Sequence, residues 1–226
     1  MNSHIEICRI AGIPIYLDMF FVLLLCVFAF PYFTTGDQQL MSVGIIVIVG
    51  LLISILLHEL GHALVARFFG VRTAEIELTG LGGLARFANA LPRSPFARSL
   101  IFLGGPAVNL LLWQGLMLGA YSIAGSGFGI AGGTALTLAL NNFWLLVFNL
   151  LPAFPLDGGR TLEALLTAVL SPAWAIRIVS VLGLVCAAGC VLMALQGAFW
   201  LLLLAFVLYQ HNWAALSSVG GIKGGR

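Results

Sequence analysis

Long apolar segments, separated by short polar connections, make up most of this chain of 226 residues. A helix needs about 20 apolar residues to cross the hydrocarbon core of a bilayer. Six segments meet or approach that length, at about 17–33, 41–69, 97–121, 133–151, 173–195 and 198–216. The first is not expected to be a signal peptide, because a single Arg precedes it and no small-x-small cleavage site follows it. The pattern predicts a polytopic α-helical membrane protein with six transmembrane helices, forming a single integral membrane domain over residues 1–226.

Two shorter stretches carry the period-two alternation that is typical of β-strands. Residues 5–16 (IEICRIAGIPIY) are interrupted at Gly12 and Pro14, and residues 72–87 alternate on either side of a turn at Gly80, Gly82 and Gly83. Together they predict a small membrane-associated sheet with a hairpin over 72–87. The hairpin is either a surface hairpin with solvated glutamates or an edge strand that receives an extended peptide by strand addition. In the second interpretation its three glycines contact the substrate.

Charged residues make up only 8% of the chain and apolar residues 61%, with a mean hydropathy of +1.10. A soluble domain carries about 25% charged residues, so the composition also indicates an integral membrane protein. With six spans, every Lys and Arg falls on one side, which the positive-inside rule makes cytoplasmic: Arg9, Arg67, Arg72, Arg86, Arg93, Arg98, Arg160, Arg177, Lys223 and Arg226. Both termini and the sheet are therefore expected in the cytoplasm, in a multi-pass protein of the cell membrane. The chain has no basic stripe with interleaved aromatic residues, so nucleic-acid binding is not expected.

The sequence His58-Glu59-Leu60-Gly61-His62 lies inside the second apolar segment. Ionisable groups inside a membrane are costly and are a functional-site hypothesis by default. On a helix, residues four apart share a face, so His58 and His62 can bind one metal ion. Glu59 lies beside the pair, where it can act as a base toward a water molecule. The alternative, two core histidines held by hydrogen bonds, leaves the cost of burying three polar groups without compensation.

A zinc hydrolase needs a third protein ligand and an open position for water. Of the eight acidic residues, Asp157 and Glu163 follow the fourth apolar segment on the side toward which the histidines lie. Two prolines before Asp157 block a continuous helix, and an interrupted helix of this kind is expected to line a cavity. Asp157 is then either a metal ligand or the N-cap of a helix over 159–170, with Glu163 as a solvated residue of that helix.

These two motifs together resemble the site-2 proteases, a family of intramembrane zinc metalloproteases. The second family motif, N-x-x-P-x-x-P-x-D-G, runs here from Asn149 to Gly158. The resemblance extends to the segments 12–15 (GIPI) and 105–109 (GPAVN) and to the glycine-rich hairpin. It implies one Zn²⁺ per chain held by His58, His62 and Asp157, with Glu59 as the catalytic base and Asn149 positioning the substrate backbone.

Two polar features of the apolar segments stay open on the residues alone. The segment 105–109 is equally well explained as a kink for helix packing. Asn141 and Asn142, in the fourth segment, are expected either to bond between helices or to serve the cavity of the site.

The resemblance further implies an enzyme that hydrolyses peptide bonds within or near the transmembrane segment of single-span membrane proteins, releasing a cytosolic fragment. Many relatives carry a PDZ domain or nucleotide-sensing repeats, and these 226 residues contain neither. Substrate selection is therefore expected from the membrane domain, from partners, or from earlier trimming of the substrate by another protease. A metal transporter is a rival, but it needs ionisable residues along a path through the bilayer. A zinc scaffold without activity is another, but it has no use for Glu59, which is not a ligand.

Overall fold

The computed structural model describes residues 4–34, 36–80, 82–124 and 129–220. This part of the chain forms four strands and seven helices, in the order β1 (His4–Ile10), β2 (Ile13–Asp18), α1 (Met19–Phe33), α2 (Gln38–Phe68), β3 (Thr73–Thr79), β4 (Gly82–Phe87), α3 (Pro95–Ala124), α4 (Ile130–Asn149), α5 (Asp157–Leu166), α6 (Pro172–Leu195) and α7 (Leu201–Gly220). The chain divides into two compact units. The first comprises Met1–Leu91 with Gly104–Leu146, and the second comprises Pro92–Leu103 with Val147–Arg226.

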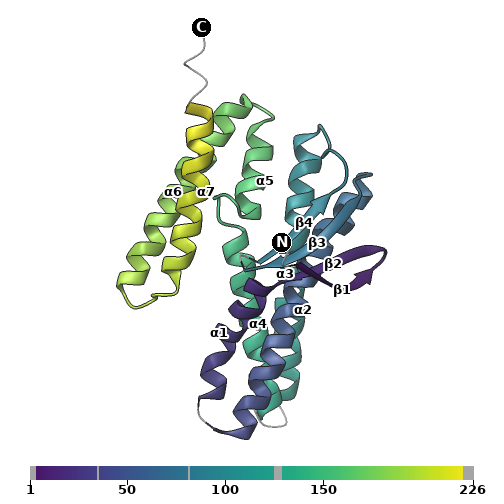
Figure 1. Ribbon diagram of the computed structural model, residues 1–226, viewed down its shortest axis with the longest axis vertical. Helices are drawn as coiled ribbons and strands as arrows, with labels where there is room; N and C mark the ends of the chain where they lie inside the picture. The colour runs from purple at the N-terminus through teal and green to yellow at the C-terminus, as the bar shows by residue number, and fades with distance from the viewer. Residues whose placement is uncertain (1–3, 35, 81, 125–128, 221–226) are drawn as a thin grey trace. The chain divides into compact units, whose positions relative to one another are not determined.

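The first unit contains a four-stranded sheet in the order β1-β2-β3-β4 (Figure 1). β1 and β2 form an antiparallel hairpin whose turn residues Ala11 and Gly12 both have positive φ, at 51° and 84°. β2 runs parallel to β3, and β3 pairs with β4 in antiparallel register, with Leu78 opposite Gly83. The small sheet and the hairpin over 72–87 are confirmed. β4 is the last strand in the order, so one of its edges has no strand beside it in the described sheet.

Cross-strand ion pairs hold the hairpin of β3 and β4. Arg86 donates from its guanidinium to the Glu77 carboxylate at 2.8 Å, and its Nε lies 3.5 Å from the Glu75 carboxylate. Glu77 is buried, with 7% of its surface exposed. The interpretation of this hairpin as one with solvated glutamates is therefore wrong for Glu77, whose charge is compensated by Arg86.

The sheet packs on the helices of the same unit through an apolar core. Ile15, Ile76 and Leu78 from the strands are fully buried together with Phe21 of α1, and Ile55 of α2 joins this cluster. α1 begins directly after β2 because the Asp18 carboxylate accepts the backbone N–H of the second helical residue. Burying such side chains contributes about 1.5–3 kcal/mol each. The core therefore ties the sheet to α1 and to the middle of α2.

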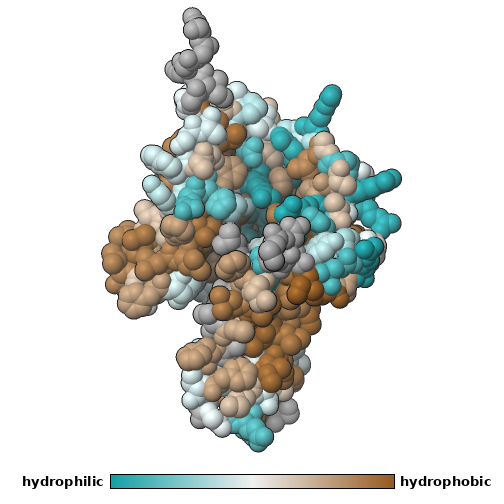
Figure 2. All heavy atoms as spheres, in the orientation of Figure 1, coloured by the Kyte–Doolittle hydropathy of each residue, from teal (hydrophilic) through white to brown (hydrophobic). Residues whose placement is uncertain are grey.

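Among the described residues, five helices are long and apolar enough to cross a membrane: α2, α3, α4, α6 and α7. The first predicted span is the 15-residue helix α1, which is shorter than the about 20 residues of a typical span. The prediction of six spans is therefore not confirmed, although the multi-pass α-helical class is. Figure 2 shows hydrophobic surface along the helices and hydrophilic side chains over the sheet. The tail cations Lys223 and Arg226 lie outside the described residues.

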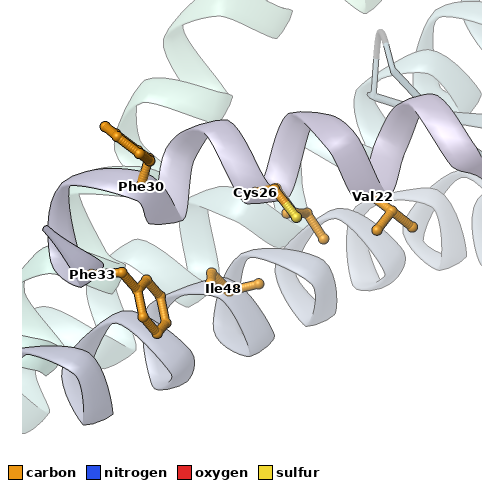
Figure 3. Close-up of a pocket in the computed structure, with 6 residues that line it drawn as sticks. Val22, Cys26, Phe30, Phe33 and Ile48 are labelled. Carbon is orange, nitrogen blue, oxygen red and sulfur yellow. The ribbon is translucent and has the colours of Figure 1, made fainter. Parts of the chain in front are cut away.

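An apolar groove of about 390 Å³ lies between α1 and α2 (Figure 3). The described residues that line it are apolar apart from one thiol: Val22, Leu25, Cys26, Phe30, Phe33 and Ile48. Such a surface suits hydrocarbon and not the polar chemistry predicted for the histidine motif.

The second unit is built on α6 and α7, which pack side by side (Figure 1). Its core consists largely of small side chains that let the two helices approach closely: Ala153, Ala187, Cys190, Ala194, Leu201, Ala205 and Leu208. The short helix α5 packs against α6. This unit carries the segment 149–158 that contains the second sequence motif.

Candidate metal centre

The long helix α2 presents the two histidines of the HExxH motif on one face. Their Nε2 atoms lie 3.1 Å apart, and both side chains are buried, with 6% of each residue exposed. α2 is held as a single helix of 31 residues, and the Asp37 carboxylate caps its first backbone N–H groups. The two histidines, four residues apart, therefore share one face of the helix as the sequence predicts, and their ring nitrogens are close enough to bind the same metal ion.

Two consecutive glycines of α3 make room for this arrangement. Gly61 of α2 faces Gly104, where a Cβ on Gly61 would lie 2.5 Å from the Gly104 carbonyl oxygen. The backbones of the two helices therefore touch, which only glycine permits at this separation. At Gly105, a Cβ would lie 2.5 Å from His58 Nε2 and closer still to His62 Nε2. The missing side chain of Gly105 thus leaves open the space toward which both nitrogens face.

The space beside Gly105 fits a zinc ion. In tetrahedral sites, Zn–N distances are about 2.0–2.1 Å, which places two nitrogen ligands about 3.3 Å apart. The observed separation of 3.1 Å between the two Nε2 atoms is close to that value. Imidazole nitrogen is also a preferred zinc ligand. The two imidazole nitrogens on α2 therefore have the chemistry and the separation expected of two of the four ligands in a tetrahedral zinc site.

Glu59 adjoins the histidine pair and is even more deeply buried, with 4% of its surface exposed. The backbone of Gly83 in β4 lies directly against it, since a Cβ there would come within 2.5 Å of the Glu59 carboxyl carbon. The carboxylate is therefore located between the histidine face of α2 and the last strand of the sheet. A buried carboxylate beside two imidazoles is suited to proton transfer.

A chain of hydrogen bonds runs from His58 away from the metal face. His58 Nδ1 lies 2.5 Å from Asn109 Oδ1, and the amide nitrogen of Asn109 donates to Asn142 Oδ1 at 3.0 Å. Asn142 donates in turn to Ser54 Oγ at 3.0 Å and to the Leu138 carbonyl at 2.9 Å. Both asparagines are fully buried. Asn142 therefore bonds between helices, and Asn109, left open by the sequence, contacts a histidine of the motif.

The second unit positions Asp157 in the first turn of α5. The N-cap of that helix is Leu156, so the alternative prediction of Asp157 as N-cap is wrong. Gly159 is buried against the preceding turn, where a Cβ would lie 2.5 Å from the Ala153 carbonyl carbon. The glycines after Asp157 therefore let α5 fold back tightly on the segment that leads into it.

Asn212 of α7 fastens this leading segment. Its side-chain oxygen accepts the Phe154 backbone N–H at 3.1 Å, and its nitrogen donates to the Phe154 carbonyl at 2.8 Å. Asn212 is fully buried, and the adjacent Gly183 of α6 leaves space for its amide. The residue satisfies both backbone groups of Phe154, three residues before Asp157.

Of the predicted substrate-binding residues, Gly83 contacts Glu59 of the histidine motif. Gly82, the first residue of β4, has a positive φ of 116°, and Gly80 packs against Phe20. Asn149 is the last residue of α4 and belongs to the second unit. Their contact with substrate stays a prediction.

Sequence reasoning did not find Ser54 or Asn212 as parts of this machinery. Each is a polar side chain within an apolar helix, which was the available signal. The hydrogen-bond partners of these two side chains could not be identified from the sequence. Contacts between helices depend on how each helix is rotated about its axis and shifted along it, which the sequence pattern does not determine.

The surrounding apolar helices and the buried histidine motif define the class of protein: a membrane protein with an HExxH metal centre. The chain belongs to peptidase family M50, whose family model matches residues 46–135 and 130–193. The prediction of the site-2 protease family, with zinc as the metal, is thereby confirmed.

Individual relatives agree with this membership. A zinc metalloprotease of Methanocaldococcus jannaschii is 35% identical over 172 residues, which cover 74% of this chain and 47% of the relative. Stage IV sporulation protein FB of Bacillus subtilis is 33% identical over 113 residues, covering 50% of this chain and 37% of that protein. The chain thus spans about half or less of these relatives' lengths.

A solved structure, the site-2 protease from Methanocaldococcus jannaschii, matches with a TM-score of 0.69 and 29% identity. The match covers 94% of this chain and 95% of that chain. The mostly helical fold with a small sheet is therefore that of a site-2 protease.

Proposed function

We propose that this protein is a zinc metalloendopeptidase that cleaves single-span membrane proteins within or near their transmembrane segment. The observation that carries the proposal is the pair of Nε2 atoms 3.1 Å apart at Gly105, buried in an apolar helix with Glu59 beside them. A metal-binding or transport role would account for the histidines. It would not account for a non-ligand carboxylate buried against the edge strand of a sheet.

His58, His62 and Asp157 are the proposed ligands of one Zn²⁺ per chain. The two histidines supply neutral nitrogen donors and Asp157 an anionic oxygen, a donor set of the kind found in catalytic zinc sites with an open fourth position. When bound, zinc would lower the pKa of a water molecule and polarise a peptide carbonyl. Membership of peptidase family M50 and its similarity to relatives named zinc metalloproteases support this assignment.

Glu59 is the proposed general base. Its carboxylate accepts a proton from the attacking water and returns it to the amine of the departing peptide segment. Its burial keeps bulk water from competing for that proton, and its neighbours on α2 hold it next to the imidazoles. Because it is not a ligand, its replacement by Gln should leave the metal in place.

The free edge of β4 is the proposed docking position for substrate. A transmembrane helix hides its amides in its own hydrogen bonds, so a substrate must be unwound before it is cut. A strand added to β4 would run about 4.8 Å from it, and Gly83 of β4 touches Glu59. Strand addition would thus hold an extended peptide close to the base. Asn149 and the hairpin glycines Gly80 and Gly82 are proposed as further contacts to the peptide backbone.

We further propose that α1 crosses the membrane as a sixth, short span, with both termini in the cytoplasm. Its residues are apolar throughout, and the positive charges then fall on one side. Cleavage near that side would release a cytosolic fragment, and earlier trimming by another protease would make the substrate short enough to enter. Reporter fusions at residues 36 and 226 test the topology: a periplasmic or extracellular signal at 36 and a cytoplasmic one at 226 are expected.

Cleavage-site mapping tests the proposed reaction. The purified protein in detergent is incubated with a panel of single-span proteins that carry helix-destabilising residues, and the products are weighed by mass spectrometry. A cut within or beside the apolar segment, absent from the Glu59→Gln variant, is the expected result. Cuts only in soluble regions distant from the span, or cuts that persist in Glu59→Gln, would refute the proposal.

A further inference from the structure

The hydrogen-bond chain behind His58 has a direction that the described atoms determine. The Leu138 carbonyl can only accept, so the Asn142 atom that meets it at 2.9 Å must be the amide nitrogen. The other side-chain atom of Asn142, its oxygen, then faces Asn109. Only the amide nitrogen of Asn109 can donate to that oxygen, at 3.0 Å. Asn109 therefore turns its oxygen toward His58.

This direction assigns the tautomer of His58. The atom facing Asn109 Oδ1 is His58 Nδ1, which must carry the proton in order to donate. A neutral imidazole has a single N–H, so His58 Nε2 keeps its lone pair on the side of Gly105. Ser54 closes the far end, since its hydroxyl accepts from Asn142 and donates to the Gly50 carbonyl at 2.8 Å.

We propose that Asn109 and Asn142, with Ser54, form a buried relay that sets the tautomer and orientation of His58 for zinc. The inference rests on the proposed function, because it concerns a ligand of the same site. These asparagines are positioning residues: they act on the metal through His58. Histidine ligands commonly donate their second N–H to an oxygen acceptor, and loss of such an acceptor typically weakens metal binding 10–100-fold.

The cost of building the relay supports a purpose beyond packing. Both asparagines have no exposed surface, and Ser54 has 5%. Unpaired amides in such surroundings cost several kcal/mol, whereas apolar side chains would pack helices α2, α3 and α4 without that risk. The printed bonds all run in one direction, from His58 through Asn109 and Asn142 to Ser54, so the chain begins on a residue of the HExxH motif.

Replacement of Asn109 separates this role from packing. Asn109→Leu keeps the number and branching of the side-chain heavy atoms and removes the acceptor, whereas Asn109→Asp keeps an acceptor for His58. Zinc affinity is measured by competition with a chromogenic chelator, and the tautomer by nitrogen NMR of protein labelled with ¹⁵N-histidine, with His58→Gln as the assignment control. We expect 10–100-fold weaker zinc binding and a mixed His58 tautomer in Asn109→Leu, and recovery of both in Asn109→Asp.

Two matched variants on α4 distinguish loss of the relay from general misfolding. Asn142→Leu breaks the relay one step further away and should also mix the His58 tautomer. Asn141→Leu, at the neighbouring position outside the relay, should leave it unchanged. A His58 spectrum and a zinc affinity that are unaltered in Asn109→Leu and Asn142→Leu would overturn the relay, and so would equal loss in Asn141→Leu.

The spectrum also separates this inference from the proposed function. The wild-type protein without added zinc should already show His58 protonated at Nδ1, irrespective of any peptidase activity. If the wild type neither binds zinc nor cleaves substrate, the proposed function fails and the tautomer still decides the relay. If the wild type binds zinc while His58 is protonated at Nε2 in its zinc-free form, the relay fails alone.

Discussion

The substitution Gly105→Ala places one methyl group where the two ring nitrogens of the motif meet. A Cβ at this position would lie 2.5 Å from His58 Nε2, whereas ordinary van der Waals contact begins at 3.4 Å. His58 must therefore move by about 0.9 Å, and His62 by at least as much. Metal–ligand distances tolerate only about 0.2 Å, so the displacement is more than four times what the site accepts.

We expect this variant to bind zinc at least about 100-fold more weakly, which corresponds to about 2.7 kcal/mol. Peptidase activity at limiting zinc should fall in parallel. The fold should survive, because Ala is preferred over Gly in a helix by about 1 kcal/mol and local overpacking costs about 1–3 kcal/mol. Zinc affinity by chelator competition and thermal unfolding by circular dichroism measure the two effects separately.

Gly115→Ala on the same helix is the matched control, since a Cβ there would meet no atom within 4 Å. It should retain wild-type zinc affinity and unfold at an equal or slightly higher temperature. Wild-type zinc affinity in Gly105→Ala would refute the reasoning, because it would mean that the metal does not sit where the two Nε2 atoms face. Equal loss of zinc in both variants would refute it as well.

Two further substitutions test other parts of the site. Gly83→Ala pushes a methyl group against the Glu59 carboxylate, so cleavage should fall by at least tenfold while zinc content stays near that of the wild type; loss of zinc, or full activity, would contradict the position assigned to β4. Asn212→Leu leaves the N–H and carbonyl of Phe154 without their partner, at a cost of about 1–3 kcal/mol for each group. It should lower the unfolding temperature and speed amide hydrogen exchange at Phe154, and unchanged exchange there would contradict the proposed anchoring of the segment before Asp157.

Each of these two variants has a control on the same chain. Gly133→Ala in α4 adds a methyl group in open space and should leave cleavage unchanged. Gln210→Leu removes an exposed amide from α7, two residues from Asn212, and should leave exchange at Phe154 unchanged. Effects of similar size in a control would indicate general destabilisation.

Local sequence patterns were sufficient to predict α2, β3 and β4, which carry the histidine motif and the hairpin glycines. The apolar segment around the HExxH motif predicted a helix over 41–69, and α2 spans Gln38–Phe68. The period-two alternation around the hairpin glycines likewise predicted β3 and β4. The helix is predicted because a span needs about 20 apolar residues, and the strands are predicted because burial on one face of a strand imposes a period of two on the sequence.

Contacts between elements were beyond such reasoning. The Gly61–Gly104 approach and the bond from His58 to Asn109 depend on how α2 and α3 are rotated about each other. The burial of Glu77 depends on pairing with Arg86 across the hairpin. Composition shows that such polar groups need partners, whereas tertiary packing decides which partner each one finds.

The residue at which α1 begins was difficult to predict for a different reason. The apolar run at 17–33 reads as a span, yet Asp18 caps the helix and β2 occupies the residues before it. The strand takes Leu17 into its pairing with β1, which shortens the helix to 15 residues. Leu17 also pairs with Leu78 of β3, so a strand far away in the sequence contributes to this competition between sheet and helix.

Metal content and cleavage, measured together in the wild type and Glu59→Gln, test most directly whether the protein is a zinc peptidase with Glu59 as its base. Both proteins are purified in detergent, their zinc is quantified, and each is incubated with a cleavable single-span substrate with and without a chelator. Zinc near one per chain in both is expected, with cleavage only by the wild type and none after chelation. Cleavage by Glu59→Gln would show that Glu59 is not the base, and a well-folded wild type without zinc would show that the protein is not a zinc peptidase.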